Sequence, residues 1–393
     1  MKKIFFIVLP LLVILGCREI FESPVKSPST GYLVVEGAIN SGEGSTIIIL
    51  SRTTSLDDKK MLYEKGAIIS IEGEDKSSRV LKENPNGQYI GQNLGLNSNQ
   101  KYQLKIITSR GKKYLSDFVA VNINQPIDSL SLKRENGGVQ IYVNTQNSKN
   151  STNYYQWETE QTWEYHAEMT SALKYEITGT PNRPIYKAVY RFPKTPGTID
   201  SSLFMCWESV SNTNLLIANT EKLTKDLIYH PLAYIPPNSN HLNVLYSINV
   251  RQITWSKEGY EFLDRIQKNT EKTGSIFDAQ PSELNGNIHN VDDPTEPVIG
   301  FANISPIQEK RIYLNRKMFD DWYFPIFYCK RDTLVNTSAY IIANEGVDLI
   351  PIQNGDCFGC GPLDVKVFFA AEQLCVDCTL KGGTNKRPTF WPK

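Results

Sequence analysis

Residues 155–165 read YQWETEQTWEY, an alternation that points to a long β-strand. Successive side chains of a strand point to opposite faces, so the aromatic residues fall on one side and the acidic ones on the other. The aromatic face carries Tyr155, Trp157, Thr159, Gln161, Trp163 and Tyr165, and the opposite face carries Glu158, Glu160 and Glu164. Residues 242–251 alternate between apolar and polar in the same way. Strands with one apolar and one polar face are typical of antiparallel sheets, so we expect a mainly β fold.

The composition agrees with a mainly β fold and argues against nucleic acid as a partner. Aromatic residues make up 11% of the 393-residue chain and charged residues 21%, and short β-branched runs are frequent, which favours β-structure. Residues 1–16 hold two of the 42 basic residues and no acid, so residues 17–393 carry 40 basic and 42 acidic residues, a net charge of −2. That balance gives no electrostatic reason to bind nucleic acid. The length predicts two or three domains.

Seven short strand candidates lie between residues 32 and 124, separated by polar or glycine-rich turns. They are Tyr32–Ile39, Thr46–Ser51, Ala67–Glu72, Ser78–Lys82, Gln88–Gly91, Tyr102–Thr108 and Lys113–Val121. Short strands at this spacing predict a β-sandwich domain over residues 32–124. We expect its boundary at Asn124-Gln125-Pro126.

Residues 125–393 are predicted to form a larger antiparallel β-rich domain with a cysteine-rich C-terminal tail. A polar, proline-containing stretch around 177–200 is expected to be a loop between the two long strands. Phe262, Leu263 and Ile266 form an apolar stripe at helical spacing. This stripe predicts one short helix over about Lys257–Asn269.

The N-terminal segment has the features of an exported lipoprotein. Two lysines precede an apolar run from Ile4 to Leu15, which has signal-peptide length and is shorter than the roughly 20 residues of a membrane span. Gly16-Cys17 closes the run and resembles a lipobox, whose cysteine is acylated and becomes the N-terminus. We expect a signal peptide at 1–16 and a lipidated tether at 17–31, with Cys17 holding the protein to the membrane. The alternative is an ordinary signal peptide that happens to contain a cysteine.

Six further cysteines remain, an even number that indicates disulfides in an oxidising compartment. They are Cys206, Cys329, Cys357, Cys360, Cys375 and Cys378. The last four form two CxxC units, which also match a four-thiolate zinc site or a redox-active pair. We favour disulfides that join the two CxxC units to each other and Cys206 to Cys329. Four cysteines allow three connectivities, and the sequence does not choose among them.

Few residues stand out as a site for chemistry. Trp157 and Trp163 are candidate ligand-facing aromatics that could stack on a sugar, although we expect this face to be core. The four histidines, His166, His230, His241 and His289, occur in no metal-ligand spacing, and no catalytic or nucleotide-binding motif is present. His289 lies near Asp292, Asp293 and Glu296, which suggests either a small cation site or, more simply, a solvated acidic loop. We therefore expect no catalytic residue, metal or cofactor.

Several separated motifs resemble one family, the Bacteroidota outer-membrane lipoproteins known as domain of unknown function 4249. The matching pieces are Leu33–Gly37, Leu50–Thr53, Cys206-Trp207, Thr273–Asp278, Gly286–Ile288, Val298–Phe301, Cys375–Thr379, Gly382–Thr384 and Pro388–Trp391. Arg18–Glu22 also resembles the acidic tag of lipoproteins that are exported to the cell surface.

The resemblance implies an N-terminal immunoglobulin-like or carboxypeptidase-regulatory-like β-domain, an outer-membrane location and a TonB-dependent receptor as partner. It implies no catalytic residue. We therefore expect a surface-exposed, lipid-anchored, non-enzymatic binding accessory of such a receptor. The alternatives are a structural or adhesion protein of the cell surface, and a hydrolase whose carboxylates converge only in the fold.

Overall fold

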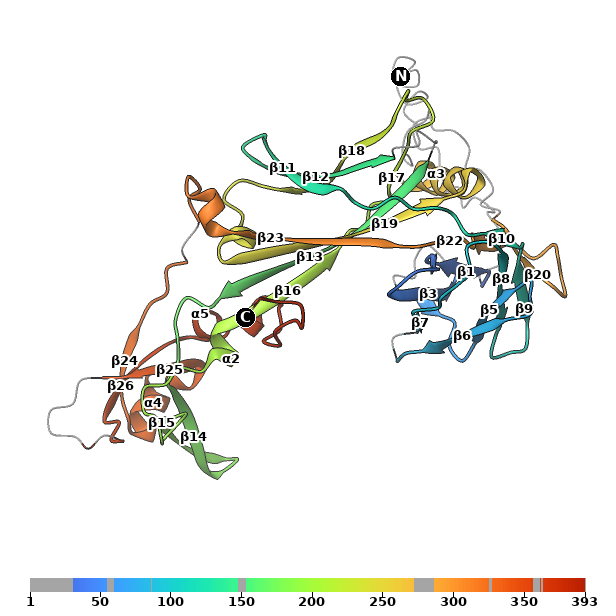
Figure 1. The fold of residues 1–393 in the computed structure, drawn as a ribbon. Helices are drawn as coiled ribbons and strands as arrows, with labels where there is room; N and C mark the ends of the chain where they lie inside the picture. Colours follow the sequence, from blue (N-terminus) through green and yellow to red (C-terminus); the bar gives the residue numbers. More distant parts are fainter. Residues whose placement is uncertain are drawn as a thin grey trace, which may run out of the picture.

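The computed structural model describes residues 31–54, 60–85, 87–147, 153–271, 286–324, 327–355, 361 and 363–392 (Figure 1). Within these ranges the chain is mainly β, as predicted. A β-sandwich lies at one end of an elongated molecule, two long sheets form the middle, and a small sheet with a hairpin lies at the other end (Figure 1). The predicted signal peptide, Cys17 and nearly all of the predicted tether lie outside the described residues.

The first domain contains all the predicted strands. They are β1 (Leu33–Glu36) with β2 (Ile39–Asn40), β3 (Ser45–Arg52), β5 (Ile68–Gly73), β6 (Ser78–Glu83), β7 (Gln88–Gln92), β8 (Lys101–Ile107), and β9 (Lys113–Ser116) with β10 (Val119–Ala120). The two-residue β4 (Leu62–Tyr63) is additional. Apolar side chains from β1 and β3 and from β5 and β8 are buried in one cluster, which includes Leu50 and Ile69. The sheet therefore folds over a single core and forms a sandwich.

This first sheet also takes strands from far along the chain. β20 (Ile288–Asn290) pairs antiparallel with β9, and β21 (Val298–Gly300) pairs parallel with β1. β22 (Ile304–Ser305) pairs parallel with β2. The sequence-based boundary assigned these three strands to the second domain, and the pairing places them with the first. Strands of two or three residues have no periodicity of their own, so only their distant partners reveal them.

Two packed sheets form the middle of the molecule. One contains β13 (Tyr154–His166), β16 (Met205–Ser211), β17 (Leu216–Asn219), β19 (Leu245–Trp255) and β23 (Gln308–Asn315), and the other contains β11 (Ser129–Glu135), β12 (Gly138–Asn147) and β18 (Asp226–Ile235). The predicted strand at 155–165 is confirmed as β13. The strand predicted from residue 242 begins three residues later, because Asn240–Leu242 form a 3₁₀ turn, η2, that buries Leu242.

The expected loop around 177–200 is partly wrong. Residues 173–190 form a hairpin of β14 (Leu173–Thr180) and β15 (Arg183–Tyr190). Its base packs against a sheet of β24 (Asp332–Val335), β25 (Leu349–Asn354) and β26 (Val367–Glu372), where Leu173, Ala188 and Phe368 are buried together. Ile177 and Ile185, farther along the hairpin, are exposed. Because backbone pairing rather than burial maintains this outer half, its composition resembles that of a loop.

The predicted helix is confirmed as α3 (Lys257–Glu271), which buries Phe262 and Leu263. Shorter helical segments are α2 (Ser201–Phe204), α4 (Ser338–Ala343), α5 (Gln373–Val376), η3 (Arg316–Phe319), η4 (Gly346–Asp348) and η5 (Cys378–Lys381). In the part of the chain that the structure describes, no helix combines the length and apolar character needed to cross a membrane.

Candidate functional site

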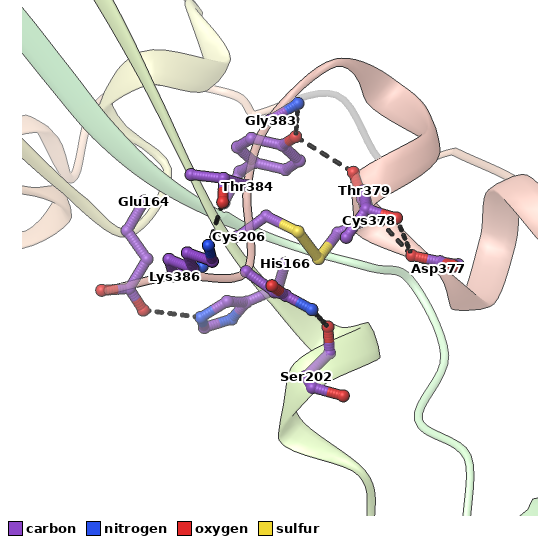
Figure 2. Close-up of a disulfide and its surroundings, with 12 residues drawn as sticks. Glu164, His166, Ser202, Cys206, Asp377, Cys378, Thr379, Gly383, Thr384 and Lys386 are labelled. Carbon is purple, nitrogen blue, oxygen red and sulfur yellow. Dashed lines mark hydrogen bonds and ion pairs between the residues drawn. A yellow bond between two sulfur atoms is a disulfide. The ribbon is translucent and has the colours of Figure 1, made fainter. Parts of the chain in front are cut away.

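Two disulfides connect the C-terminal tail to the rest of the molecule. Cys206 on β16 bonds Cys378 at the start of η5, with a Cα–Cα distance of 5.8 Å (Figure 2). Cys329 bonds Cys375 in α5, with a Cα–Cα distance of 6.0 Å. Disulfide formation is thus confirmed, but the predicted Cys206–Cys329 bridge and the predicted pairing of the two CxxC units are wrong.

The connectivity follows from where the second CxxC unit lies. Cys375 ends up beside the segment before β24, while Cys378 faces β16, so the two neighbours bond to different parts of the chain. Two of the four thiolates required for the alternative zinc site are therefore in disulfides. Cys357 and Cys360 lie outside the described residues.

Beyond the disulfides, the tail lies along the middle sheet. Trp207 and Thr384 form an isolated antiparallel bridge. The hydroxyl of Tyr165 accepts a hydrogen bond from Gly383 N at 2.9 Å and donates one to Cys378 O at 3.0 Å. Trp391 is 5% exposed and donates its indole N–H to Glu164 at 2.8 Å. The tail is therefore a packed part of the fold.

Glu164 accepts a second hydrogen bond through its other carboxylate oxygen, Oε1, from His166 Nε2 at 2.7 Å (Figure 2). Burial would raise the pKa of Glu164, but the hydrogen bonds from His166 and Trp391 outweigh burial and hold the pKa below its ordinary value. His166 thus serves as a partner for a buried carboxylate.

The candidate ligand-facing aromatics are core residues. Trp157 is 0% exposed and donates its indole N–H to Gln252 Oε1 at 2.9 Å, and Trp163 is 8% exposed. The three-stranded sheet covers this face of β13, and the rings of His230 and His241 stack on Trp157 and Trp163. Assigning these tryptophans as possible ligand contacts was wrong, and the expectation that they form the core is confirmed.

The acidic side chains near His289 form hydrogen bonds within the fold. Glu296 accepts hydrogen bonds from Lys112 Nζ at 2.7 Å and from Tyr114 Oη at 2.8 Å. Asp293 caps the turn by accepting from Thr295. His289 is oriented instead toward Asp117, 3.7 Å away. Within the described ranges, no group of three or more His, Cys, Asp or Glu residues is arranged to hold a metal ion.

A cleft in the described surface lies where the β-sandwich meets α3. Segment 117–122 lines it together with the side of α3 that carries Glu258, Glu261 and Arg265, and residues 286–287 and 301–303 complete the lining. The cavity measures about 560 Å³. Among the lining residues, Asn287 Oδ1 accepts a hydrogen bond from Ala302 N at 2.7 Å, and Asn303 Nδ2 donates one to Thr254 O at 3.0 Å. These buried amides fix the walls of the cleft.

The chemistry of this cleft is mixed. Asp117, Glu258 and Glu261 contribute three carboxylates and Arg265 one guanidinium, which gives the lining a net charge of −2. Phe118 is 44% exposed and adds an aromatic surface. Clefts at domain interfaces with aromatic and convergent polar groups are common places for ligands. The sequence did not identify this site, because its walls come from segments more than 130 residues apart.

These features describe a mainly β-protein with a disulfide-fastened tail and a polar cleft between its sandwich and α3. The chain belongs to the family described as Domain of unknown function (DUF4249), whose model matches residues 18–311. The match covers 294 of the 393 residues and ends before the cysteine-rich tail. No curated protein matches the chain.

Proposed function

We propose that this chain is a lipid-anchored protein of the outer membrane, exposed at the cell surface, that binds a ligand without chemically changing it and serves a TonB-dependent receptor. The order of lysines, apolar run, Gly16 and Cys17 supports the anchor. The receptor partner is what the resemblance to lipoproteins of the matched family implies.

The observation that carries the binding role is the cleft between the β-sandwich and α3. It joins exposed carboxylates, a guanidinium and a phenyl ring in one cavity of about 560 Å³. Its lining amides Asn287 and Asn303 form hydrogen bonds to backbone, which supports a cleft that is already shaped before a ligand binds. A preformed cleft loses less conformational entropy on binding than a mobile one.

Recovery of the complex from membranes tests this proposal. An affinity tag inserted at Pro181-Asn182, in the exposed turn between β14 and β15, leaves the buried Trp391 undisturbed. We expect detergent extracts of the outer membrane to yield the full-length protein together with a TonB-dependent receptor. A Cys17→Ala variant serves as the control, and it should leave the membrane fraction and lose the receptor.

Two results would count against different parts of the proposal. If the Cys17→Ala variant fractionates with the membrane as the natural protein does, the lipid anchor is wrong. If the natural protein is anchored but recovers no receptor even after cross-linking on intact cells, the partner is wrong.

A further inference from the structure

The outer face of the sheet β11–β12–β18 carries tyrosines and mostly uncharged polar side chains, in rows that a register shift between Ile141 and Tyr142 separates. The inner face of this sheet is core, with Val139, Ile141 and Val143 almost fully buried. Since neighbours alternate along each strand, the residues between them point outward. Direct pairing then sets three rows across the sheet: Ser129–Asn144–Tyr229, Ser131–Tyr142–Pro231 and Lys133–Gln140–Tyr234.

Three tyrosines, Tyr142, Tyr229 and Tyr234, lie on this face. The rings of Tyr142 and Tyr229 stack with centroids 4.2 Å apart and planes 6° apart. Tyr229 is nevertheless 53% exposed and Tyr234 is 40% exposed. The stacking fixes the Tyr229 ring, so a ligand that packs against it would find it already ordered.

Amides and hydroxyls occupy the positions between the tyrosines. Asn144 Nδ2 donates to Ser131 Oγ at 2.9 Å, and Gln140 Nε2 donates to Ala233 O at 2.9 Å. These bonds orient both amides. On this face, aromatic rings and polar side-chain atoms therefore occupy neighbouring positions.

The charges on this face cancel. Lys133 Nζ lies 2.6 Å from Glu135 Oε1, and the Tyr142 hydroxyl donates to the same carboxylate at 3.0 Å. No further charged residue occupies the three rows. The face thus has nothing that would attract a phosphate, a sulfate or a basic peptide, and a complementary ligand is uncharged.

From this juxtaposition we propose that the outer face of β11–β12–β18 is a binding site for a neutral glycan. The apolar C–H faces of a sugar ring pack on Tyr229, and the sugar hydroxyls hydrogen-bond to the amides and serines beside it. Strands are roughly 4.8 Å apart and outward residues of one strand roughly 7 Å apart, so the three rows cover about 10 by 14 Å. That area suits a short oligosaccharide. The site shares no residue with the cleft and requires no receptor, so it goes beyond the proposed function.

Calorimetric titration of the purified full-length protein tests the site. The probes are linear hexasaccharides of glucose, mannose and xylose, with heparin as the anionic comparison. At least one hexasaccharide should bind, and heparin should not compete. Tyr229→Ala should weaken binding about tenfold through loss of the stacking surface, whereas Tyr229→Phe should retain most of the affinity. Tyr328→Ala, at a tyrosine 93% exposed elsewhere, is the matched control and should change nothing.

Several outcomes would overturn the site. They are failure of all three hexasaccharides to bind, competition by heparin, and equal affinities for Tyr229→Ala and Tyr328→Ala. Asn144→Ala gives a second measurement that leaves the tyrosine pair intact, and it should also weaken binding. If Tyr229→Ala instead abolishes recovery of the membrane partner and leaves sugar binding unchanged, the face is a protein interface and the glycan proposal is wrong.

Discussion

Trp391 and Glu164 are 227 residues apart in the sequence, and in the structure the indole N–H of one donates to the carboxylate of the other at 2.8 Å. This hydrogen bond joins the end of the tail to the C-terminal end of β13. Both residues are buried, at 5% and 8% exposed. The polar side of the longest strand is therefore partly covered by the C-terminus.

Trp391→Ala should destabilise the protein by about 3 kcal/mol, because a large buried side chain is lost and a buried carboxylate loses one donor. Trp391→Phe keeps most of the apolar contact and should cost about 1 kcal/mol. Urea unfolding followed by circular dichroism measures both. Tyr328→Ala is an exposed aromatic control, and a Trp391→Ala protein as stable as this control would mean that the tail does not pack as described.

Glu164 should make stability fall at acid pH. Its pKa in the folded protein lies below the 4.5 of a free glutamate. The stabilisation from this carboxylate is present above that value and is lost as pH falls through the lower, folded pKa. Unfolding free energies between pH 6 and pH 3 should show the loss, and Glu164→Gln should reduce its slope. An unchanged slope in Glu164→Gln would show that other groups account for the acid sensitivity.

His230 and His241 should contribute a second pH dependence at milder acidity. Both rings stack on buried tryptophans, and burial lowers the pKa of each below 6.5. The unfolded chain then takes up protons before the folded one, so stability declines as pH falls from about 7 through 6.5 and below. Replacing both histidines by phenylalanine should make the midpoint of thermal unfolding less dependent on pH between pH 7.5 and pH 5.5. His289→Phe, at an exposed histidine, is the matched control for replacing an imidazole by a phenyl ring.

The two disulfides should contribute different amounts to the free energy of unfolding. They close loops of 172 and 46 residues, and the longer loop restricts the unfolded chain more. On the chain-entropy account, Cys206→Ala with Cys378→Ala should cost about 1 kcal/mol more than Cys329→Ala with Cys375→Ala. Denaturant titrations of the two double variants test this order. The reverse order would mean that strain or residual structure in the unfolded chain outweighs loop length.

Asn124 should be important for the stability of the fold, although the sequence predicts that it lies at a domain boundary. It is 9% exposed, its amide donates to Gln252 O at 2.7 Å and Pro306 O at 2.9 Å, and its oxygen accepts from Thr254 Oγ1 at 2.7 Å. Asn124→Ala leaves these buried groups without a partner and should cost about 2 kcal/mol. Asn122→Ala, at a partly buried neighbour, should cost less. Equal losses in the two variants would argue against a special role for Asn124.

Local patterns were sufficient for much of the fold. The alternation at 155–165 identified β13, and the short runs before residue 124 identified most of the strands that the sandwich takes from the N-terminal part of the chain. Phe262, Leu263 and Ile266 located α3. Each of these elements carries its own periodicity of burial, so neighbouring residues alone reveal which face meets the core.

Contacts between distant segments were decided only by the tertiary structure. The sequence supplied six cysteines suited to disulfides, but their three-dimensional neighbours decided that Cys206 meets Cys378 and Cys329 meets Cys375. It likewise showed an aromatic face at Trp157 and Trp163, while the sheet that covers them determined that they are core and left Tyr229 exposed on the other side. The physical reason is that periodicity indicates which side of a strand is apolar. Which other part of the chain packs against that side depends on the tertiary structure.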